Sequence, residues 1–324
     1  MASVKKILVI RNDRFGEFLL IIPALRALKE SFPQAKITLG VDSSVACLVP
    51  GIEYADDMLI WDNKKHSIRE SYFFSRRLRK EGFDISVVFN PAQSSHLACF
   101  MAGIPVRVGY DRKAGYLLNK KMKDLKALGL RHEVEYNLDL VRLAGGFTKN
   151  RDISLKVEDN TYFLEGLGAG RLVAVHPWTS DPVKQWPPEK FKELINRLSG
   201  VGVVLVGGKE ELEKNKMFFE GLNERTLNLT GKTSLAELAC VLKKADILVS
   251  GDSGPVHLAA AVGTPVVALF RNDLPGKTAR RWGPWGNGHT VIERRCLEDI
   301  SADEVARVVM DRLGLGATTY GGKR

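Results

Sequence analysis

The feature that most restricts the fold of this chain is a repeated alternation of short apolar runs and helical patterns. Each run is rich in Val, Ile and Leu, and a segment with apolar residues at helical spacing follows it. Continuous apolar strands separated by helices are typical of parallel sheets covered on both faces, so the pattern predicts an α/β protein. The expected strands are Lys6–Arg11, Lys36–Val41, Met58–Trp61, Ile85–Phe89, Leu172–His176, Val201–Val206, Ile247–Ser250 and Pro265–Phe270.

The alternation starts again near residue 171, after the glycine-rich stretch Glu165–Gly170, which could act as a hinge. A chain of 324 residues is also too long for one ordinary core. We therefore expect two Rossmann-like, doubly wound domains that face each other across a cleft. The expected boundaries are 1–165 and 166–300 for the two domains, 301–314 for a helix that packs back across them, and 315–324 for a disordered tail.

The bulk composition predicts a soluble, cytoplasmic protein. Hydrophobic residues make up 44% of the chain and charged residues 27%, as is usual for globular proteins. No stretch reaches the roughly 18 apolar residues of a membrane span, and the first apolar run is too short for a signal peptide. The four cysteines form no Cys-x-x-Cys pair, which favours buried free thiols over a zinc or redox site.

The positive charge is concentrated in the first half of the chain. Residues 1–150 hold 24 Lys and Arg against 16 Asp and Glu, whereas residues 151–324 hold 24 against 22. A basic face attracts anionic partners, among which nucleic acid, anionic lipid and a phosphorylated glycolipid all qualify. Taken singly, clusters such as Arg76–Lys80 and Lys120–Lys123 are more simply interpreted as solvated helix faces.

Polar residues follow the first expected strand, at the end where ligands of open α/β sheets bind. The loop Arg11-Asn-Asp-Arg-Phe-Gly-Glu17 leads into an apolar helix. Gly16 permits a tight turn, and Glu17 falls in the first helical turn, where the helix dipole favours a carboxylate. Glu17 is therefore either a helix N-terminal charge or a general base at the floor of the cleft.

Two strand ends in the second half offer groups that suit a nucleotide. Hydroxyls and an ammonium, which favour phosphate oxygens, lie in the stretch Val175–Pro188. The stretch Val206–Glu211 has two glycines that leave room for a ligand, followed by glutamates that could bind a ribose diol or the amino group of a base. An ordinary turn is the alternative there.

The fourth strand end, after Ile247–Ser250, gives the strongest signal. It continues Asp-Ser-Gly-Pro-Val-His, in which Ser253 can cap a helix and Pro255 fits a first-turn position. The N-terminus of such a helix offers N–H groups and a positive dipole to a diphosphate. His257 lies within the first turn, where a phosphate contact is a better interpretation than a purely structural role.

Several other functions lack their motifs. No Gly-x-Gly-x-x-Gly fingerprint of a dehydrogenase occurs, and no Gly-x-Ser-x-Gly hydrolase elbow. Both Gly-Lys-Thr triplets lack the first glycine of a P-loop. Metal-dependent sugar transferases usually carry an Asp-x-Asp pair. None occurs here, so among such transferases a metal-free mechanism is favoured. No recognition motif for nucleic acid is present either.

These motifs together resemble glycosyltransferase family 9, the bacterial lipopolysaccharide heptosyltransferases, from Lys5 to about Leu313. The family's Arg-x-x-x-x-Gly-Asp, followed by a helix with Pro-Ala-Leu, is similar to Arg11–Leu25. Its Lys-x-Trp-Pro matches Lys184–Pro187, and its Asp-Thr/Ser-Gly-Pro-x-His-Leu-Ala-Ala matches Asp252–Ala260. The resemblance implies a GT-B fold and an inverting, metal-independent transfer of heptose from ADP-heptose to the inner core of lipopolysaccharide, without a cofactor.

The resemblance also implies roles for single residues. The family's catalytic base is an aspartate, and Glu17 stands at its position with a longer arm, with Asp13 as the second candidate. A further departure follows Phe270, where Arg271-Asn-Asp replaces the family's Gly-Pro-Thr. The implied acceptor contacts are Arg11, Arg14 and Gly16. The implied donor contacts are Thr179, Ser180, Lys184, Glu210, Glu211, Asp252, Ser253, Gly254 and His257.

Three alternatives stay open from the sequence. The donor could be a UDP- or GDP-sugar, or the chain could be an epimerase of similar fold. Glu17 and Arg271 also leave room for a degenerate protein that binds a nucleotide sugar or glycan without turnover. We expect an anionic lipopolysaccharide-core acceptor and no nucleic acid, and we leave open a peripheral contact with the cytoplasmic face of the inner membrane.

Overall fold

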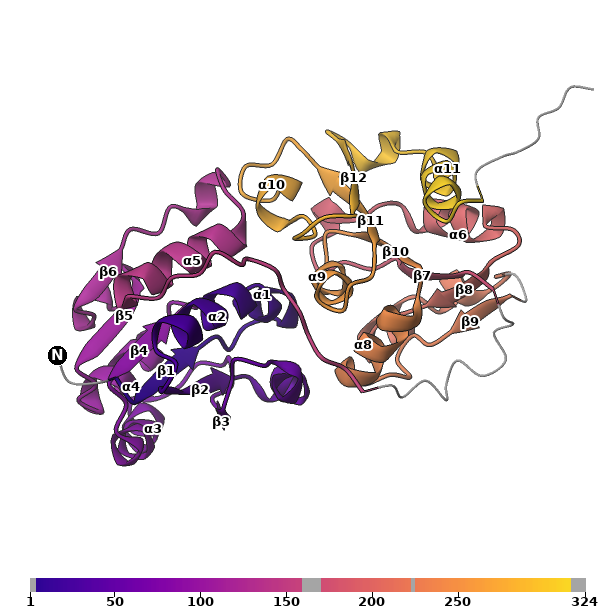
Figure 1. Ribbon diagram of the computed structural model, residues 1–324. Helices are drawn as coiled ribbons and strands as arrows, with labels where there is room; N and C mark the ends of the chain where they lie inside the picture. The colour runs from indigo at the N-terminus through magenta and orange to yellow at the C-terminus, as the bar shows by residue number, and fades with distance from the viewer. Residues whose placement is uncertain (1–3, 159–169, 223–224, 316–324) are drawn as a thin grey trace, which may run out of the picture. The chain divides into compact units, whose positions relative to one another are not determined.

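The computed structural model describes residues 4–158, 170–222 and 225–315, and it divides into two compact units, residues 1–156 and 157–324 (Figure 1). Among the described residues each unit has one six-stranded sheet, and all paired strands are parallel. The α/β class expected from the sequence is thus confirmed. Most of the expected hinge, residues 165–169, and the expected tail from residue 316 onward lie outside the described residues.

The two sheets share one strand order. The first is ordered β3-β2-β1-β4-β5-β6 and the second β12-β11-β10-β7-β8-β9. Each unit therefore begins at a central strand, extends to one edge, and then returns to build the other side, as in Rossmann folds. The strands are β1 (Lys6–Ile10), β2 (Lys36–Val41), β3 (Asp57–Ile60), β4 (Ile85–Val88), β5 (Val106–Tyr110), β6 (Lys120–Met122), β7 (Leu172–His176), β8 (Gly202–Leu205), β9 (Thr226–Asn228), β10 (Ile247–Gly251), β11 (Val266–Arg271) and β12 (Thr290–Arg294).

Helices cover both faces of the first sheet. Helices α3 and α4 pack together on one face, and α2 packs with α5 on the other (Figure 1). The buried side chains between α3, α4 and the sheet include Phe74, Leu78 and Cys99. The helices are α1 (Phe15–Leu19), α2 (Ile22–Ser31), α3 (Ile68–Glu81), α4 (Gln93–Met101) and α5 (Glu133–Ala144), with short 3-10 segments η1 (Ser43–Gly51), η2 (Gly115–Leu117) and η3 (Lys126–Leu128).

The second unit follows the same plan. Helices α6 and α11 pack together, and α8 packs with α9. The helix expected over 301–314 is α11, which contacts α6 and β11 through the buried Val305 and Val309. The helices are α6 (Pro188–Arg197), α7 (Lys209–Lys214), α8 (Leu235–Lys244), α9 (Gly254–Ala261), α10 (Ala279–Trp282) and α11 (Ala302–Arg312), with η5 (Pro182–Lys184), η6 (Lys216–Phe219) and η7 (Leu297–Asp299).

Local sequence signals explain where the longer helices begin and end. Helix α3 starts with a capping box, in which the Ser67 hydroxyl accepts from the Glu70 N–H and the Glu70 carboxylate accepts from the Ser67 N–H. It ends at Gly82, whose φ of 69° lies in the left-handed region that glycine adopts without strain. Ser234 and Glu237 form the same capping box at α8.

One expectation about the cysteines was wrong. All four are free thiols, but only Cys99 and Cys240 are buried, whereas Cys47 and Cys296 are exposed. Cys47 lies in the 3-10 segment η1 and Cys296 in the turn after β12, and neither segment contributes that side chain to a core. Within the described ranges no helix is both long and apolar enough to cross a membrane.

Trp186 lies at the centre of the second core and gives the fold a direct test. Its side chain is fully buried, its ring meets Phe191 edge-on at 4.6 Å, and its Nε1 donates to the Ile300 carbonyl oxygen at 3.1 Å. We expect Trp186→Ala to lower the free energy of unfolding by about 3–5 kcal/mol through the cavity it leaves. Trp186→Phe should cost less, because an aromatic ring still fills most of the site.

The measurement is urea denaturation followed by far-UV circular dichroism. Met217→Ala is the control, because that side chain is 80% exposed and its loss should change stability by less than about 0.5 kcal/mol. Equal stability of Trp186→Ala and Met217→Ala would contradict the core position of Trp186.

Candidate functional site

The strand order of each sheet creates one place suited to a ligand. In the first sheet the chain reverses its direction of growth between β1 and β4, and in the second between β7 and β10. Loops that leave such a pair of strands diverge to opposite faces and open a crevice at the carboxyl ends. The sequence-predicted residues after β1, β7 and β10 therefore lie at these two switch points.

At the switch point of the second unit, a cation and a carboxylate from distant parts of the chain meet. Lys184 at the end of η5 lies with its Nζ 2.6 Å from Oδ2 of Asp252, which follows β10. The two side chains are 17% and 9% exposed. Burial raises the pKa of Asp252 above its ordinary value, and the charge of Lys184 opposes that shift. Asp252 thus holds the partly buried Lys184 cation at the carboxyl ends of the central strands.

Ser253 has a different role from the one expected. It occupies the N-cap position of α9, but its side chain makes no capping hydrogen bond. Its hydroxyl lies instead 2.8 Å from the Ser250 hydroxyl and 3.2 Å from Nδ1 of His176, at the end of β7. Nδ1 of His176 also lies 3.1 Å from the Ser250 hydroxyl. The expectation that the Ser253 side chain caps the helix was wrong, because β7 and β10 are neighbours and bring these partners closer.

The N-terminus of α9 therefore has no side-chain cap. Gly254 is its first residue and is only half-buried, so backbone of this turn is accessible. His257 is buried in the same turn, with its ring 6.4 Å from that of Trp282. Burial lowers the pKa of His176 to about 3, so the imidazole that holds Ser253 is neutral at physiological pH. Backbone N–H groups at such a helix start attract anions.

The loop between β7 and α6 is fastened to its surroundings by further polar contacts. The Thr179 hydroxyl donates to the Asp252 carbonyl oxygen at 3.4 Å, while the Ser180 side chain is exposed. Asp181 of the same loop pairs with Lys277 at 2.8 Å. Arg271 at the end of β11 pairs through two nitrogens with Asp273 and reaches the Val183 carbonyl oxygen.

The two glutamates after β8 lie in different surroundings. Glu210 is turned outward and pairs with Lys214, whereas a carboxylate oxygen of Glu211 lies over Gly208, 2.6 Å from where a Cβ would be. The sequence suggested that Gly207 leaves room for a ligand, and this expectation was wrong. A Cβ there would lie 2.6 Å from Nε1 of Trp178, so the indole fills that space.

In the first unit, the loop after β1 gathers three charged groups. Nε of the buried Arg11 donates to Oδ1 of Asp13 at 2.6 Å. Burial raises the pKa of Glu17 above its ordinary value, the charge of Asp13 adds to the shift, and that of Arg11 opposes it. Glu17 therefore accepts a proton more readily than an ordinary glutamate. The Asp13 carboxylate, by contrast, is held by a buried cation.

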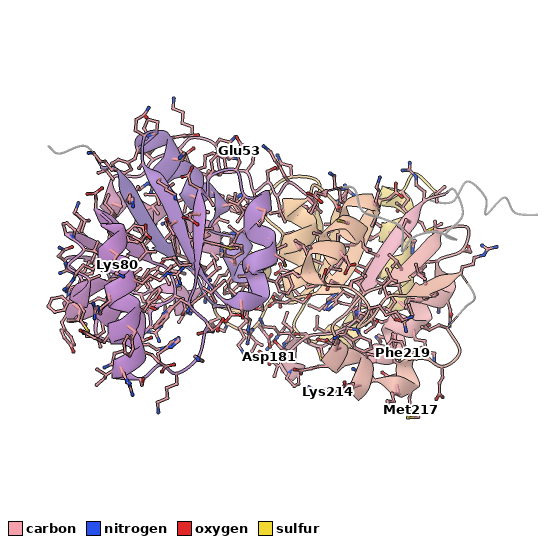
Figure 2. The ribbon with its side chains drawn as sticks, turned by 90° about the horizontal axis from the view of Figure 1, so that it is seen from below. Glu53, Lys80, Asp181, Lys214, Met217 and Phe219 are labelled. Atoms are coloured by element: carbon pink, nitrogen blue, oxygen red, sulfur yellow. The ribbon has the colours of Figure 1, made fainter. Side chains whose placement is uncertain are left out.

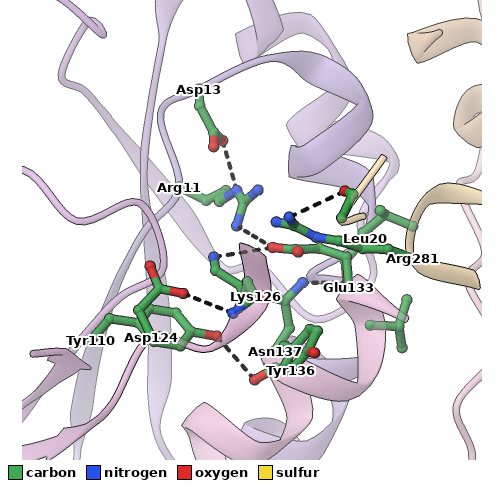
Figure 3. A network of polar contacts seen from close by, with 12 residues as sticks. Arg11, Asp13, Leu20, Tyr110, Asp124, Lys126, Glu133, Tyr136, Asn137 and Arg281 are labelled. Atoms are coloured by element: carbon green, nitrogen blue, oxygen red, sulfur yellow. Dashed lines mark hydrogen bonds and ion pairs between the residues drawn. The ribbon is translucent and has the colours of Figure 1, made fainter. Parts of the chain in front are cut away.

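A buried polar network supports this loop from below (Figure 3). Glu133, fully buried at the start of α5, lies 3.6 Å from Nη1 of Arg11 and 3.2 Å from Nζ of Lys126. Nζ of Lys126 also lies 4.3 Å from the centre of the Tyr110 ring. Burial lowers the pKa of Lys126, and the charge of Glu133 opposes that shift. The network fixes the position of Arg11 and, through it, of Asp13.

The remaining residues expected on this loop divide between helix and surface. Gly16 lies inside α1 and is buried, so it is a helix residue and not the turn residue that the sequence suggested. Arg14, which precedes the helix, is exposed. Sequence reasoning missed the supporting residues His176, Ser250 and Glu133, since each acts through a partner distant along the chain. In the parts of the chain that the structure describes, no group of three metal-ligating side chains occurs.

Comparison with known proteins identifies the family. Residues 72–307 match the model of glycosyltransferase family 9 (heptosyltransferase). Lipopolysaccharide heptosyltransferase 2 of Escherichia coli strain K12 is 27% identical over 295 residues, which cover 84% of each chain. The protein of the same name from Salmonella typhimurium is 28% identical over 297 residues, again 84% of each chain.

Solved structures agree on the fold. The structure of E. coli ADP-heptose LPS heptosyltransferase II matches with a TM-score of 0.83 and 24% identity, and the match covers 95% of this chain and 98% of that one. A glycosyl transferase family 9 structure from Veillonella parvula matches with a TM-score of 0.85 and 21% identity, over 97% and 98% of the two chains. These likenesses confirm a GT-B fold. Because the family model also covers well over half of the sequence, the chain belongs to glycosyltransferase family 9 and is a glycosyltransferase.

Proposed function

We propose that this enzyme transfers heptose from ADP-heptose to the inner core of lipopolysaccharide, with inversion at the anomeric carbon and without a metal. The observation that carries the proposal is the group of Lys184, Asp252 and the uncapped start of α9 at the second switch point. The match to the heptosyltransferase family and the names of the relatives support the sugar and the acceptor.

The second unit is proposed to hold the donor. A diphosphate needs positive charge and N–H donors, which Lys184 and the α9 N-terminus supply. Thr179 and Ser180 of the loop after β7 and His257 of α9 are proposed to complete the phosphate site. At the nucleoside end we favour Glu211 over Glu210, because its carboxylate lies over Gly208 whereas Glu210 is committed to Lys214. Both glutamates stay in the proposed set, together with Ser253 and Gly254.

The first unit is proposed to activate the acceptor. Glu17 takes a proton from an acceptor hydroxyl, and the hydroxyl oxygen attacks the anomeric carbon from the face opposite the diphosphate. The bond to the diphosphate breaks, and Lys184 with the helix dipole stabilises the negative charge that leaves. Asp13 is the weaker candidate for the base because Arg11 holds its carboxylate. Arg11 itself is buried, so we assign it a positioning role and leave Arg14 as an exposed contact for an anionic acceptor.

A donor comparison tests the function as a whole. Purified protein is incubated with a heptose-deficient inner-core acceptor and with ADP-heptose, UDP-glucose or GDP-mannose, and products are detected by mass spectrometry. We expect a heptosylated product with ADP-heptose only, in buffer that contains EDTA. Transfer from another donor would overturn the assignment of the sugar nucleotide, and a strict need for added Mg²⁺ would overturn the metal-free mechanism.

Lys184→Ala should weaken ADP binding about tenfold or more, because a charge-assisted contact to phosphate contributes about 1.5–3 kcal/mol. Isothermal titration calorimetry measures the Kd. Lys216→Ala is the matched control, since that lysine is exposed on η6 and has no proposed role in the site. ADP affinity that is unchanged in Lys184→Ala would exclude this lysine from the donor site.

Glu17→Gln should lower kcat about 100-fold or more while the Kd for ADP stays the same. The substitution keeps the shape of the side chain and removes its capacity to take a proton. Glu17→Asp tests the length of the arm, since the family's own residue should retain activity if the acceptor has not adjusted to glutamate. A near-normal kcat in Glu17→Gln would move the base elsewhere, with Asp13 next in line.

The pH dependence of the Asp13→Asn variant shows which of the two carboxylates, Glu17 or Asp13, is the base. The charge of Asp13 contributes to the raised pKa of Glu17, so removing it should lower that pKa. A base works when deprotonated, so the acidic limb of kcat/KM should move to lower pH in Asp13→Asn. Loss of that limb in this variant would instead mean that Asp13 is the base.

A further inference from the structure

The outward face of α3 carries an unusual combination of side chains. The helix buries Ser71, Phe74, Ser75 and Leu78 against its own unit. The opposite side, half a turn away around the helix axis, bears Arg69, Phe73, Arg76 and Lys80, which share one face of a helix. Figure 1 shows α3 beside α4 on one face of the first sheet, and Figure 2 labels Lys80 near the end of α3.

Large apolar side chains on this helix are left in contact with solvent. Ile68 is 76% exposed, Tyr72 45% and Phe73 56%. The rings of Tyr72 and Phe73 lie 5.8 Å apart, and the guanidinium of Arg69 lies 5.7 Å from the Phe73 ring. Single exposed apolar residues are ordinary on a protein surface. Three within six consecutive residues of a helix form a patch, and such patches mark interaction sites.

The charge around this patch is strongly positive. Five cations occur within twelve residues of the helix, namely Arg69, Arg76, Arg77, Arg79 and Lys80. Its two acidic residues lie to the side and are engaged. Glu70 completes the capping box and lies 3.5 Å from Lys64, and Glu81 pairs with Lys6 at 3.2 Å. The acids therefore do not neutralise the outward face.

Aromatic side chains beside arginines suit the boundary between water and lipid. Tyr and Phe bury an apolar ring at the level of the headgroups, while Arg and Lys bind the lipid phosphates. A helix of fourteen residues is about 21 Å long and can lie flat on such a surface. The most exposed apolar residue of this helix, Ile68, is aliphatic, and it gains from lipid but cannot stack on a nucleic acid base.

We propose that the outward face of α3 docks this enzyme on an anionic lipid bilayer. Ile68, Tyr72 and Phe73 enter the headgroup region, and the cations of the helix pair with lipid phosphates. The partner is the lipid surface itself and not the sugar acceptor. The proposal goes beyond the sugar transfer described above, and it stands whether or not the donor is ADP-heptose.

Co-sedimentation of the full chain with vesicles tests the proposal. We expect binding to vesicles of phosphatidylcholine mixed with phosphatidylglycerol, little binding to pure phosphatidylcholine, and release at high salt. The triple variant R69Q/R76Q/K80Q should bind the anionic vesicles about tenfold more weakly or worse. The control K149Q/K216Q/R307Q removes the same charge from exposed positions elsewhere and should bind within about twofold of the natural protein.

The apolar part of the patch has its own variant. Y72S/F73S keeps every charge and should still weaken binding several-fold, because the rings no longer enter the headgroup region. Circular dichroism and ADP affinity show that each variant is folded, and both should be unchanged. An equal loss of vesicle binding in R69Q/R76Q/K80Q and K149Q/K216Q/R307Q would show that net charge alone causes the binding, and it would overturn the proposal. Tighter binding to an oligonucleotide than to vesicles, lost in R69Q/R76Q/K80Q, would assign the face to nucleic acid instead.

Discussion

Both units depend on one constraint, which is the parallel pairing of two central strands. The chain leaves these two strands toward opposite sides of the sheet. β1 pairs with β4 and β7 with β10, so the loops that leave each pair diverge and expose the strand ends. Polar groups distant along the chain then share a small space. Asn90 contacts Asn12 in the first unit, and Lys184 meets Asp252 in the second. Strand order, more than local sequence, decides which groups become neighbours.

The two switch points handle buried charge in different ways. In the first unit Arg11 lies between Asp13 and Glu133, and Lys126 completes a closed set in which each buried charge has a partner. Such a set is costly to break and holds its loop in one position. In the second unit Lys184 pairs with Asp252 and is partly open to solvent. A cation held in that way can exchange or share its partner when an anionic ligand arrives.

The sequence predicted eight of the twelve strands that the described residues form, and it missed four. All eight expected strands exist, with ends that differ by one residue at most. The missed strands are β5 and the edge strands β6, β9 and β12, which are shorter or more polar because an edge is covered on fewer sides. Motifs placed Lys184 and Asp252 in one site. They could not reveal His176 beside Ser253, because that contact depends on which strands are adjacent.

The diverted hydroxyl of Ser253 has a consequence for protein engineering. A helix whose N-cap side chain bonds elsewhere gives up stability that a capping residue normally provides. Substitutions chosen to improve heat resistance would target this position first, yet a side chain that satisfies the first turn of α9 would compete with any anion seated there. If the proposed diphosphate site is correct, stability of the helix start and binding of the donor are opposed at this one residue.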